Sequence, residues 1–125
     1  MRHLRRRVRV LGRVADRDLP ALYAGAVALV LPSLYESVGF TALEAMACGT
    51  AVVSSDGGGL PTTVGDAGVL VPATDVDAWT SALVRIAGDD QLRAVNVAKG
   101  RERATARSWK RAALAYLDIY SELSS

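Results

Sequence analysis

The chain has 125 residues, half of them apolar and 22% charged, which is the balance of a folded domain and not of a disordered segment. The longest apolar run is strand-sized, far short of the roughly 20 residues that a membrane-spanning helix needs. With its single cysteine, Cys48, the chain cannot form an internal disulfide, and no signal-peptide pattern follows the basic start. We therefore expect a reducing cytoplasmic setting.

The net charge of +2 conceals an asymmetry between the start of the chain and the rest. Residues 1–13 hold six arginines and no acid, whereas residues 14–125 hold nine basic and thirteen acidic residues. A nucleic-acid surface needs cations spread over one face with aromatic residues nearby. These arginines instead alternate with Val8 and Val10, as on the solvent side of a strand. We expect no nucleic-acid partner and treat residues 1–7 as a basic leader.

The first elements along the chain are expected to be a strand, a helix and a second strand. Residues 8–11 have the pattern of a short strand, and Asp16 or Asp18 can cap a helix over residues 19–25. Residues 26–31 are continuously apolar, which is typical of a parallel strand with both faces covered.

The strand pattern recurs at residues 51–55 and 69–71, and helical segments are expected at residues 40–47 and 60–64. This order predicts an α/β fold, a parallel sheet of about four strands with helices on both faces. A doubly wound nucleotide-binding domain has about six strands. Residues 8–125 therefore look like the second, C-terminal half of a doubly wound, Rossmann-like domain.

Helices are expected to fill the chain from residue 75 onward. Asp75, Asp89 and Ser108 each precede a helical pattern and can cap it. The third of these helices has one apolar stripe, which consists of Trp109, Ala113, Tyr116, Tyr120 and Leu123.

The segment most informative about chemistry runs from the end of the predicted strand at residues 26–31 into the next helix. A loop carries Glu36 and Gly39, and the helix begins near Phe40, at the carboxyl end of a parallel sheet, where ligands bind. The N–H groups of Gly39, Phe40 and Thr41 would form an anion site suited to a diphosphate. Gly39, without a side chain, would let a ligand approach the backbone closely.

Two of the four glutamates, Glu36 and Glu44, bracket this turn. A carboxylate can accept two hydrogen bonds side by side, so Glu44 suits vicinal hydroxyls such as those of a ribose, and Glu36 the hydroxyls of a sugar. Spacing alone leaves open that neither has a role, since two glutamates eight positions apart are common. Glu102 and Glu122 have the pattern of solvated surface residues.

Residues 32–53 resemble the signature of the family 4 retaining glycosyltransferases of the GT-B type, which have two Rossmann-like domains, and more loosely that of bacterial glycogen synthases. The family pattern is Pro-Ser-x-x-Glu-x-x-Gly-x-x-x-x-Glu-Ala-Met-Ala-Cys-Gly-x-Pro-Val-Val, and this chain matches nearly all of it, with Ala51 in place of the second proline. The resemblance extends over about residues 8–123.

The resemblance implies a GT-B C-terminal domain with a role for each residue of the motif. Glu36 would be the catalytic residue, in contact with the hydroxyls of the donor sugar, and Glu44 would bind the ribose. It implies transfer with retention from a UDP- or GDP-sugar, without a metal, and with the leaving diphosphate helping to deprotonate the acceptor. The other donor-binding residues that it implies are Val38, Gly39, Phe40 and Thr41 along the diphosphate and sugar, and Val14 beside the base.

We therefore expect a hexosyltransferase segment that uses a nucleotide sugar and an acceptor glycan, lipid or small molecule, with no cofactor. The alternatives are a catalytically incomplete remnant that binds nucleotide sugars, or an interaction module on the same scaffold. The family's acceptor domain and its phosphate-binding Arg and Lys have no counterpart here. A missing N-terminal domain or self-association would then complete the sheet, and the complete enzyme would be cytoplasmic or peripheral to the inner membrane face.

Several other features carry less weight. Thr62 stands where the family commonly has a glutamate, which leaves one polar contact of the loop at residues 57–59 open. The Asp75–Asp77 pair spells a metal-binding pattern of another glycosyltransferase class but is explained as a helix start. We expect Cys48 to be packed and not reactive. For Tyr35 the sequence leaves two positions open, one facing the site and one in the core or at its rim.

Overall fold

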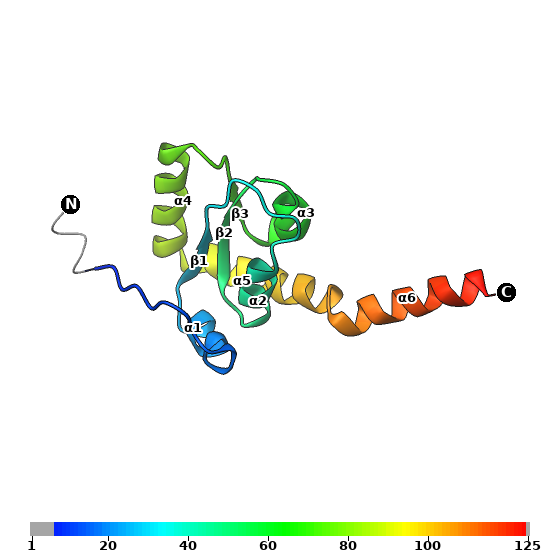
Figure 1. The fold of residues 1–125 in the computed structure, drawn as a ribbon. Coiled ribbons are helices and arrows are strands. Elements are labelled where there is room, and N and C mark those ends of the chain that lie inside the picture. The colour runs from blue at the N-terminus through cyan, green and yellow to red at the C-terminus, as the bar shows by residue number, and fades with distance from the viewer. Residues whose placement is uncertain (1–6, 125) are drawn as a thin grey trace.

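The computed structural model describes residues 7–124, in which three parallel strands lie between helices on both faces (Figure 1). The strands are β1 (Ala28–Leu31), β2 (Ala51–Ser55) and β3 (Val69–Val71), in the spatial order β1-β2-β3. The α/β class, the parallel sheet and its two helical layers are thus confirmed. Residues 1–6 of the expected basic leader, and Ser125, lie outside the described residues.

The central strand β2 is buried along its whole length because helices cover both of its faces. Its side chains alternate between the faces. Val52 packs in a cluster with α2 (Phe40–Ala47) and α3 (Leu60–Val64), and Val53 packs on the other side with α4 (Val76–Gly88). The strand predicted at residues 51–55 is thus confirmed as a buried strand.

The C-terminal helices begin where their capping side chains predict. The carboxylates of Asp75 and Asp89 accept hydrogen bonds from the N–H groups of Ala78 and Leu92, at 2.9 and 2.8 Å. They begin α4 and α5 (Asp90–Ala106), respectively. α5 crosses α2 closely at Gly100, where a Cβ atom would lie 3.0 Å from Cγ of Met46.

The strand expected at residues 8–11 is absent, so the sheet has three strands and not four. This segment is irregular and Val10 is 89% exposed. A strand needs a neighbouring backbone to pair with, and residues 8–11 run clear of the sheet (Figure 1). For the same reason β1 is an edge strand of the sheet. Its residue Val30 is 42% exposed, so the expectation that both faces of this strand are covered is wrong at Val30.

The helix expected at residues 19–25 is present as α1 (Leu19–Ala24), but no aspartate side chain caps it. A 3₁₀ turn, η2 (Asp16–Asp18), leads directly into it. Asp18 therefore has helical backbone angles, φ −96° and ψ −17°, and not the extended conformation of a capping residue. The expected cap is wrong because the chain is already helical when it reaches this position.

The last helix, α6 (Trp109–Leu123), projects away from the sheet (Figure 1). Ser108 caps it as predicted, and the apolar stripe predicted on it is exposed to solvent. At its start the ring of Trp109 stacks on Phe40, with ring centroids 5.5 Å apart. Among the described residues, no helix is long and apolar enough to cross a membrane.

Candidate functional site

The predicted motif lies at the carboxyl end of the sheet. β1 ends at Leu31 and β2 ends at Ser55, and because the two strands are parallel, the loops that follow them leave the sheet at the same end. The first loop carries Glu36 and leads into α2, and the second contains the three glycines of residues 57–59. The structure therefore brings the loop that carries Glu36 to the same end of the sheet as the glycine loop, residues 57–59.

The loop that carries Glu36 is held by main-chain contacts with the glycine loop. The N–H of Gly59 donates a hydrogen bond of 2.7 Å to the carbonyl oxygen of Glu36, and the hydroxyl of Ser55 donates to the carbonyl oxygen of Ser33. A Cβ atom on Gly59 would lie 2.0 Å from the carbonyl oxygen of Ser37. Only a residue without a side chain fits at this place.

The carboxylate of Glu36 is half-buried and has a polar partner within its own loop. Ser33 Oγ donates a hydrogen bond of 3.0 Å to Glu36 Oε1. The main chain around Glu36 is thus fixed by β2 and the glycine loop, and its side chain is oriented by the serine three residues earlier.

The backbone conformation and the packing around Gly39 both require a glycine. Its backbone is left-handed, with φ 81° and ψ 52°, and its α-carbon is buried. A Cβ atom would lie 2.6 Å from Cδ2 of Leu60. The space that a Cβ atom would occupy is filled by α3, so the glycine permits close packing of α2 on α3.

The start of α2 carries no side-chain cap. Its backbone begins with hydrogen bonds from the N–H groups of Ala42 and Leu43 to the carbonyl oxygen of Gly39. Val38, Phe40 and Thr41 are all exposed, although one face of the Phe40 ring is covered by Trp109. The helix start is therefore accessible to a ligand, as an anion site requires.

Glu44 lies on the exposed face of α2 and is also held by a hydroxyl group. Tyr23 Oη donates a hydrogen bond of 2.9 Å to Glu44 Oε2. The two side chains line an open hollow of about 490 Å³ whose other lining residues include Asp16 and Cys48. Val14 is half-buried two residues before Asp16, in the segment that leads to this hollow.

Tyr23 is an unusually weak acid at this place. Burial, with the hydrogen bond to Glu44 and the charge of that carboxylate, raises the pKa of Tyr23 to about 12. The hydroxyl therefore keeps its proton and remains a donor at neutral pH. Sequence reasoning gave no role to Tyr23, which lies 21 positions before Glu44, or to Ser33; for Ser33 the spacing of three residues from Glu36 is a usable signal.

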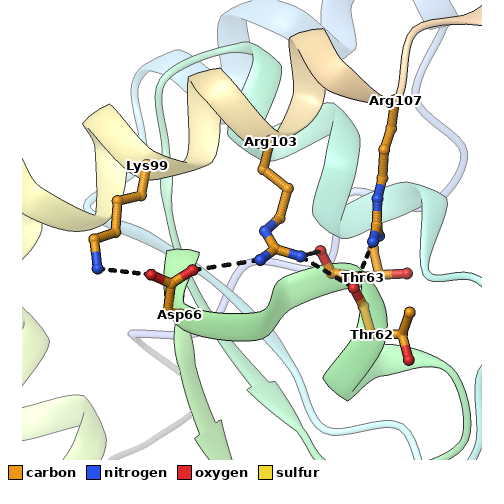
Figure 2. A network of polar contacts seen from close by, with 6 residues as sticks. All are labelled: Thr62, Thr63, Asp66, Lys99, Arg103 and Arg107. Atoms are coloured by element: carbon orange, nitrogen blue, oxygen red, sulfur yellow. Dashed lines mark hydrogen bonds and ion pairs between the residues drawn. The ribbon is translucent and has the colours of Figure 1, made fainter. Parts of the chain in front are cut away.

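A polar network fastens α3, the helix behind Gly39, to α5 (Figure 2). Arg103 donates to the carbonyl oxygens of Thr62 and Thr63, at 3.0 and 3.3 Å, and Asp66 accepts from Lys99 at 2.8 Å. The hydrogen bond from Lys99 and its charge, with a smaller effect of Arg103, lower the pKa of Asp66. At Thr62 it is thus the main chain that makes the polar contacts.

The remaining residues singled out in the sequence are placed as follows. Tyr35 is 74% exposed, so it is not part of the core, and Cys48 is half-buried beside Glu44. Glu102 and Glu122 are exposed as predicted. Within residues 7–124, no group of three or more His, Cys, Asp or Glu side chains could hold a metal ion.

Known proteins resemble this chain over nearly its full length. It is 41% identical over 116 residues to the O-antigen chain mannosyltransferase B of Escherichia coli, and 46% identical over 108 residues to the D-inositol 3-phosphate glycosyltransferase of Saccharomonospora viridis. These matches cover 93% and 85% of this chain but only 30% and 25% of the two relatives. The chain thus spans less than a third of the length of either protein.

The fold matches that of a solved GT-B enzyme. The sucrose-phosphate synthase of Thermosynechococcus elongatus superposes with a TM-score of 0.89 and 39% identity, over 97% of this chain and 31% of that one. The sequence model of the family "Glycosyl transferases group 1" matches residues 1–89. The motif, the fold and these matches agree, and the chain belongs to the group 1 glycosyl transferases.

Proposed function

We propose that the chain is the donor-binding part of a retaining glycosyltransferase that transfers a hexose from a UDP- or GDP-sugar to an acceptor glycan, lipid or small molecule. One observation carries the proposal: in a chain of this family, Glu36 and Glu44 flank the uncapped start of α2 at the carboxyl end of the sheet. The mannosyltransferase and glycosyltransferase relatives support a hexose as the transferred group.

The proposed roles follow from the position of each group. The N–H groups at the start of α2 face the diphosphate, Glu44 accepts hydrogen bonds from the ribose hydroxyls, and Glu36 contacts hydroxyls of the transferred sugar. In the reaction, the bond between the anomeric carbon and the diphosphate oxygen breaks. The acceptor oxygen bonds to that carbon on the same face, and its proton passes to the leaving diphosphate. No metal takes part in this scheme.

The chain alone is proposed to bind the nucleotide but not to transfer the sugar. It spans 25–31% of the length of the relatives named above. The resemblance to the family implies that a separate N-terminal domain holds the acceptor. Turnover is therefore measured in an assembled full-length form that includes such a domain, whereas nucleotide binding is measured on the chain itself.

The test compares Glu44→Gln with Glu36→Gln by calorimetry with UDP and GDP. Because Glu44 contacts a part of the donor that does not react, Glu44→Gln should weaken nucleotide binding roughly tenfold to a hundredfold. Glu36→Gln should leave binding of the bare nucleotide nearly intact and lower turnover in the assembled form, because charge develops at the sugar only in the transition state.

Glu102→Gln, an exposed glutamate on α5, is the matched control and should change neither quantity. Binding should also be unaffected by EDTA. The reverse pattern, with binding lost in Glu36→Gln and kept in Glu44→Gln, would exchange the two roles. If the chain binds neither nucleotide, the scaffold serves as an interaction module and the proposal is wrong.

A further inference from the structure

A contact outside the motif determines how Glu44 is presented. Exposed glutamates on helices ordinarily sample several rotamers, because water solvates each of them equally well. Glu44 is exposed, yet its Oε2 accepts the 2.9 Å hydrogen bond from Tyr23, which lies on α1 and 21 residues earlier in the chain. The contact therefore selects one orientation of an otherwise free carboxylate.

The side chain and the main chain of Tyr23, which carry this hydroxyl, are themselves fixed. Its ring packs against the core cluster formed by α2, β2 and α3. The main chain of Tyr23 is also anchored, because the buried hydroxyl of Thr50 donates a hydrogen bond of 2.6 Å to its carbonyl oxygen. The position of the hydroxyl is thus determined by the contacts of Tyr23 with the core cluster and with Thr50.

The same two side chains line one hollow, and its volume of about 490 Å³ falls within the roughly 300–1,000 Å³ of small-molecule sites. A carboxylate offers about four lone-pair positions. Tyr23 occupies one of them, on Oε2, and leaves Oε1 and the outer lone pair of Oε2 for two further donors. A vicinal diol supplies two such donors side by side.

We propose that Tyr23 is a positioning residue for Glu44, whose carboxylate it holds in the orientation that accepts both ribose hydroxyls of the donor nucleotide. This role presupposes the proposed function, since it acts only through a bound ribose. Because the carboxylate is already fixed before binding, the entropic cost of ordering it does not reduce the affinity for the ligand. That gain corresponds to about two- to tenfold in affinity.

The test removes the hydroxyl and keeps the ring. Calorimetry measures binding of UDP, GDP and ADP and of their 2′,3′-dideoxy counterparts to the unsubstituted chain, Tyr23→Phe, Glu44→Ala and the double variant. Tyr23→Phe should weaken the ribonucleotides about two- to tenfold and leave the dideoxynucleotides unchanged. In the double variant the loss should equal that of Glu44→Ala alone, because no carboxylate remains to be oriented.

Tyr116→Phe, the same chemical change on exposed α6, is the control and should have no effect. Equal weakening of ribo- and dideoxynucleotides by Tyr23→Phe would mean that the tyrosine acts through packing, and would overturn the inference. So would additive losses in the double variant. If Glu44→Ala weakens binding and Tyr23→Phe does not, the inference fails while the proposed function stands; if no nucleotide binds the unsubstituted chain, both fail.

Discussion

The two glutamates of the motif are held by different kinds of contact. Around Glu36 the main chain is fixed: Gly59 bonds to its carbonyl oxygen, and a Cβ atom on Gly58 would lie 2.3 Å from that same oxygen. Glu44 stands on a regular helix, and its carboxylate is tied by one side chain from another element, Tyr23. The main chain of Glu36 is placed by the folding of two loops, whereas the carboxylate of Glu44 is placed by a hydroxyl from a different helix.

Because of this difference, substitutions near the two glutamates are expected to change different properties. A change in the main-chain contacts around Glu36 moves the backbone and should alter stability and turnover together. A change beside Glu44 removes one polar contact from an intact helix and should alter only nucleotide binding. The variants below test whether the two effects can be separated, beginning with the largest expected change.

Gly59→Ala should have the largest effect. The added Cβ would meet the carbonyl oxygen of Ser37 at 2.0 Å, so the loop that carries Glu36 must shift. We expect a loss of about 1–3 kcal/mol in the free energy of unfolding, measured by urea denaturation, and a loss of roughly a hundredfold in turnover of the assembled form.

The matched control is Gly88→Ala, at the end of α4, where nothing lies within 4 Å of the added Cβ atom. It should leave stability and turnover unchanged. Unchanged stability and turnover in Gly59→Ala would contradict the view that main-chain contacts fix Glu36.

Ser33→Ala should have a smaller effect that is confined to turnover. The substitution removes the 3.0 Å hydrogen bond to Glu36 Oε1 but keeps the Ser33 carbonyl oxygen that accepts from Ser55. Turnover in the assembled form should fall about two- to tenfold, with nucleotide affinity of the chain unchanged. Ser37→Ala, an exposed serine of the same loop, is the control; weakened nucleotide binding in Ser33→Ala would show that the two sites are not independent.

Asp66→Asn should have the smallest effect, and only on stability, because the side-chain contacts of Asp66 are with Lys99 and Arg103 on α5 (Figure 2). Its pKa in the folded chain is lowered from 3.8, so the carboxylate stabilises the fold above pH 3.8 and loses this contribution as the pH falls through the lowered value. At pH 7 the melting temperature should drop by no more than about 3 °C.

The comparison with Asp118→Asn, on exposed α6, isolates the ion-pair contribution. The difference in melting temperature between Asp66→Asn and the unsubstituted chain should vanish in acid. These two chains should also bind nucleotide with the same affinity. A difference that persists at low pH would assign the effect to something other than the charge of Asp66.

Features with a local or periodic cause could be predicted from the sequence. The helix at Phe40–Ala47 and the strand at Ala51–Ser55 were predicted with their observed bounds. Their signals, the spacing of apolar residues and the glycines that follow the segments, lie within a short stretch of sequence. The caps at Asp75, Asp89 and Ser108 are local in the same sense, since each side chain bonds to an N–H three residues ahead.

Features that depend on which segments meet could not be predicted from spacing. Residues 8–11 have a strand-like pattern, but whether a strand forms is decided by a neighbouring backbone that this segment does not meet. The packing of Leu60 against Gly39, which requires a glycine there, is likewise a contact between segments far apart in the sequence. Among the site residues, the sequence by itself determined the motif and the end of the sheet where it lies. Only the tertiary structure decided that Tyr23 reaches Glu44, because a hydrogen bond between residues 21 positions apart exists only when folding brings α1 against α2.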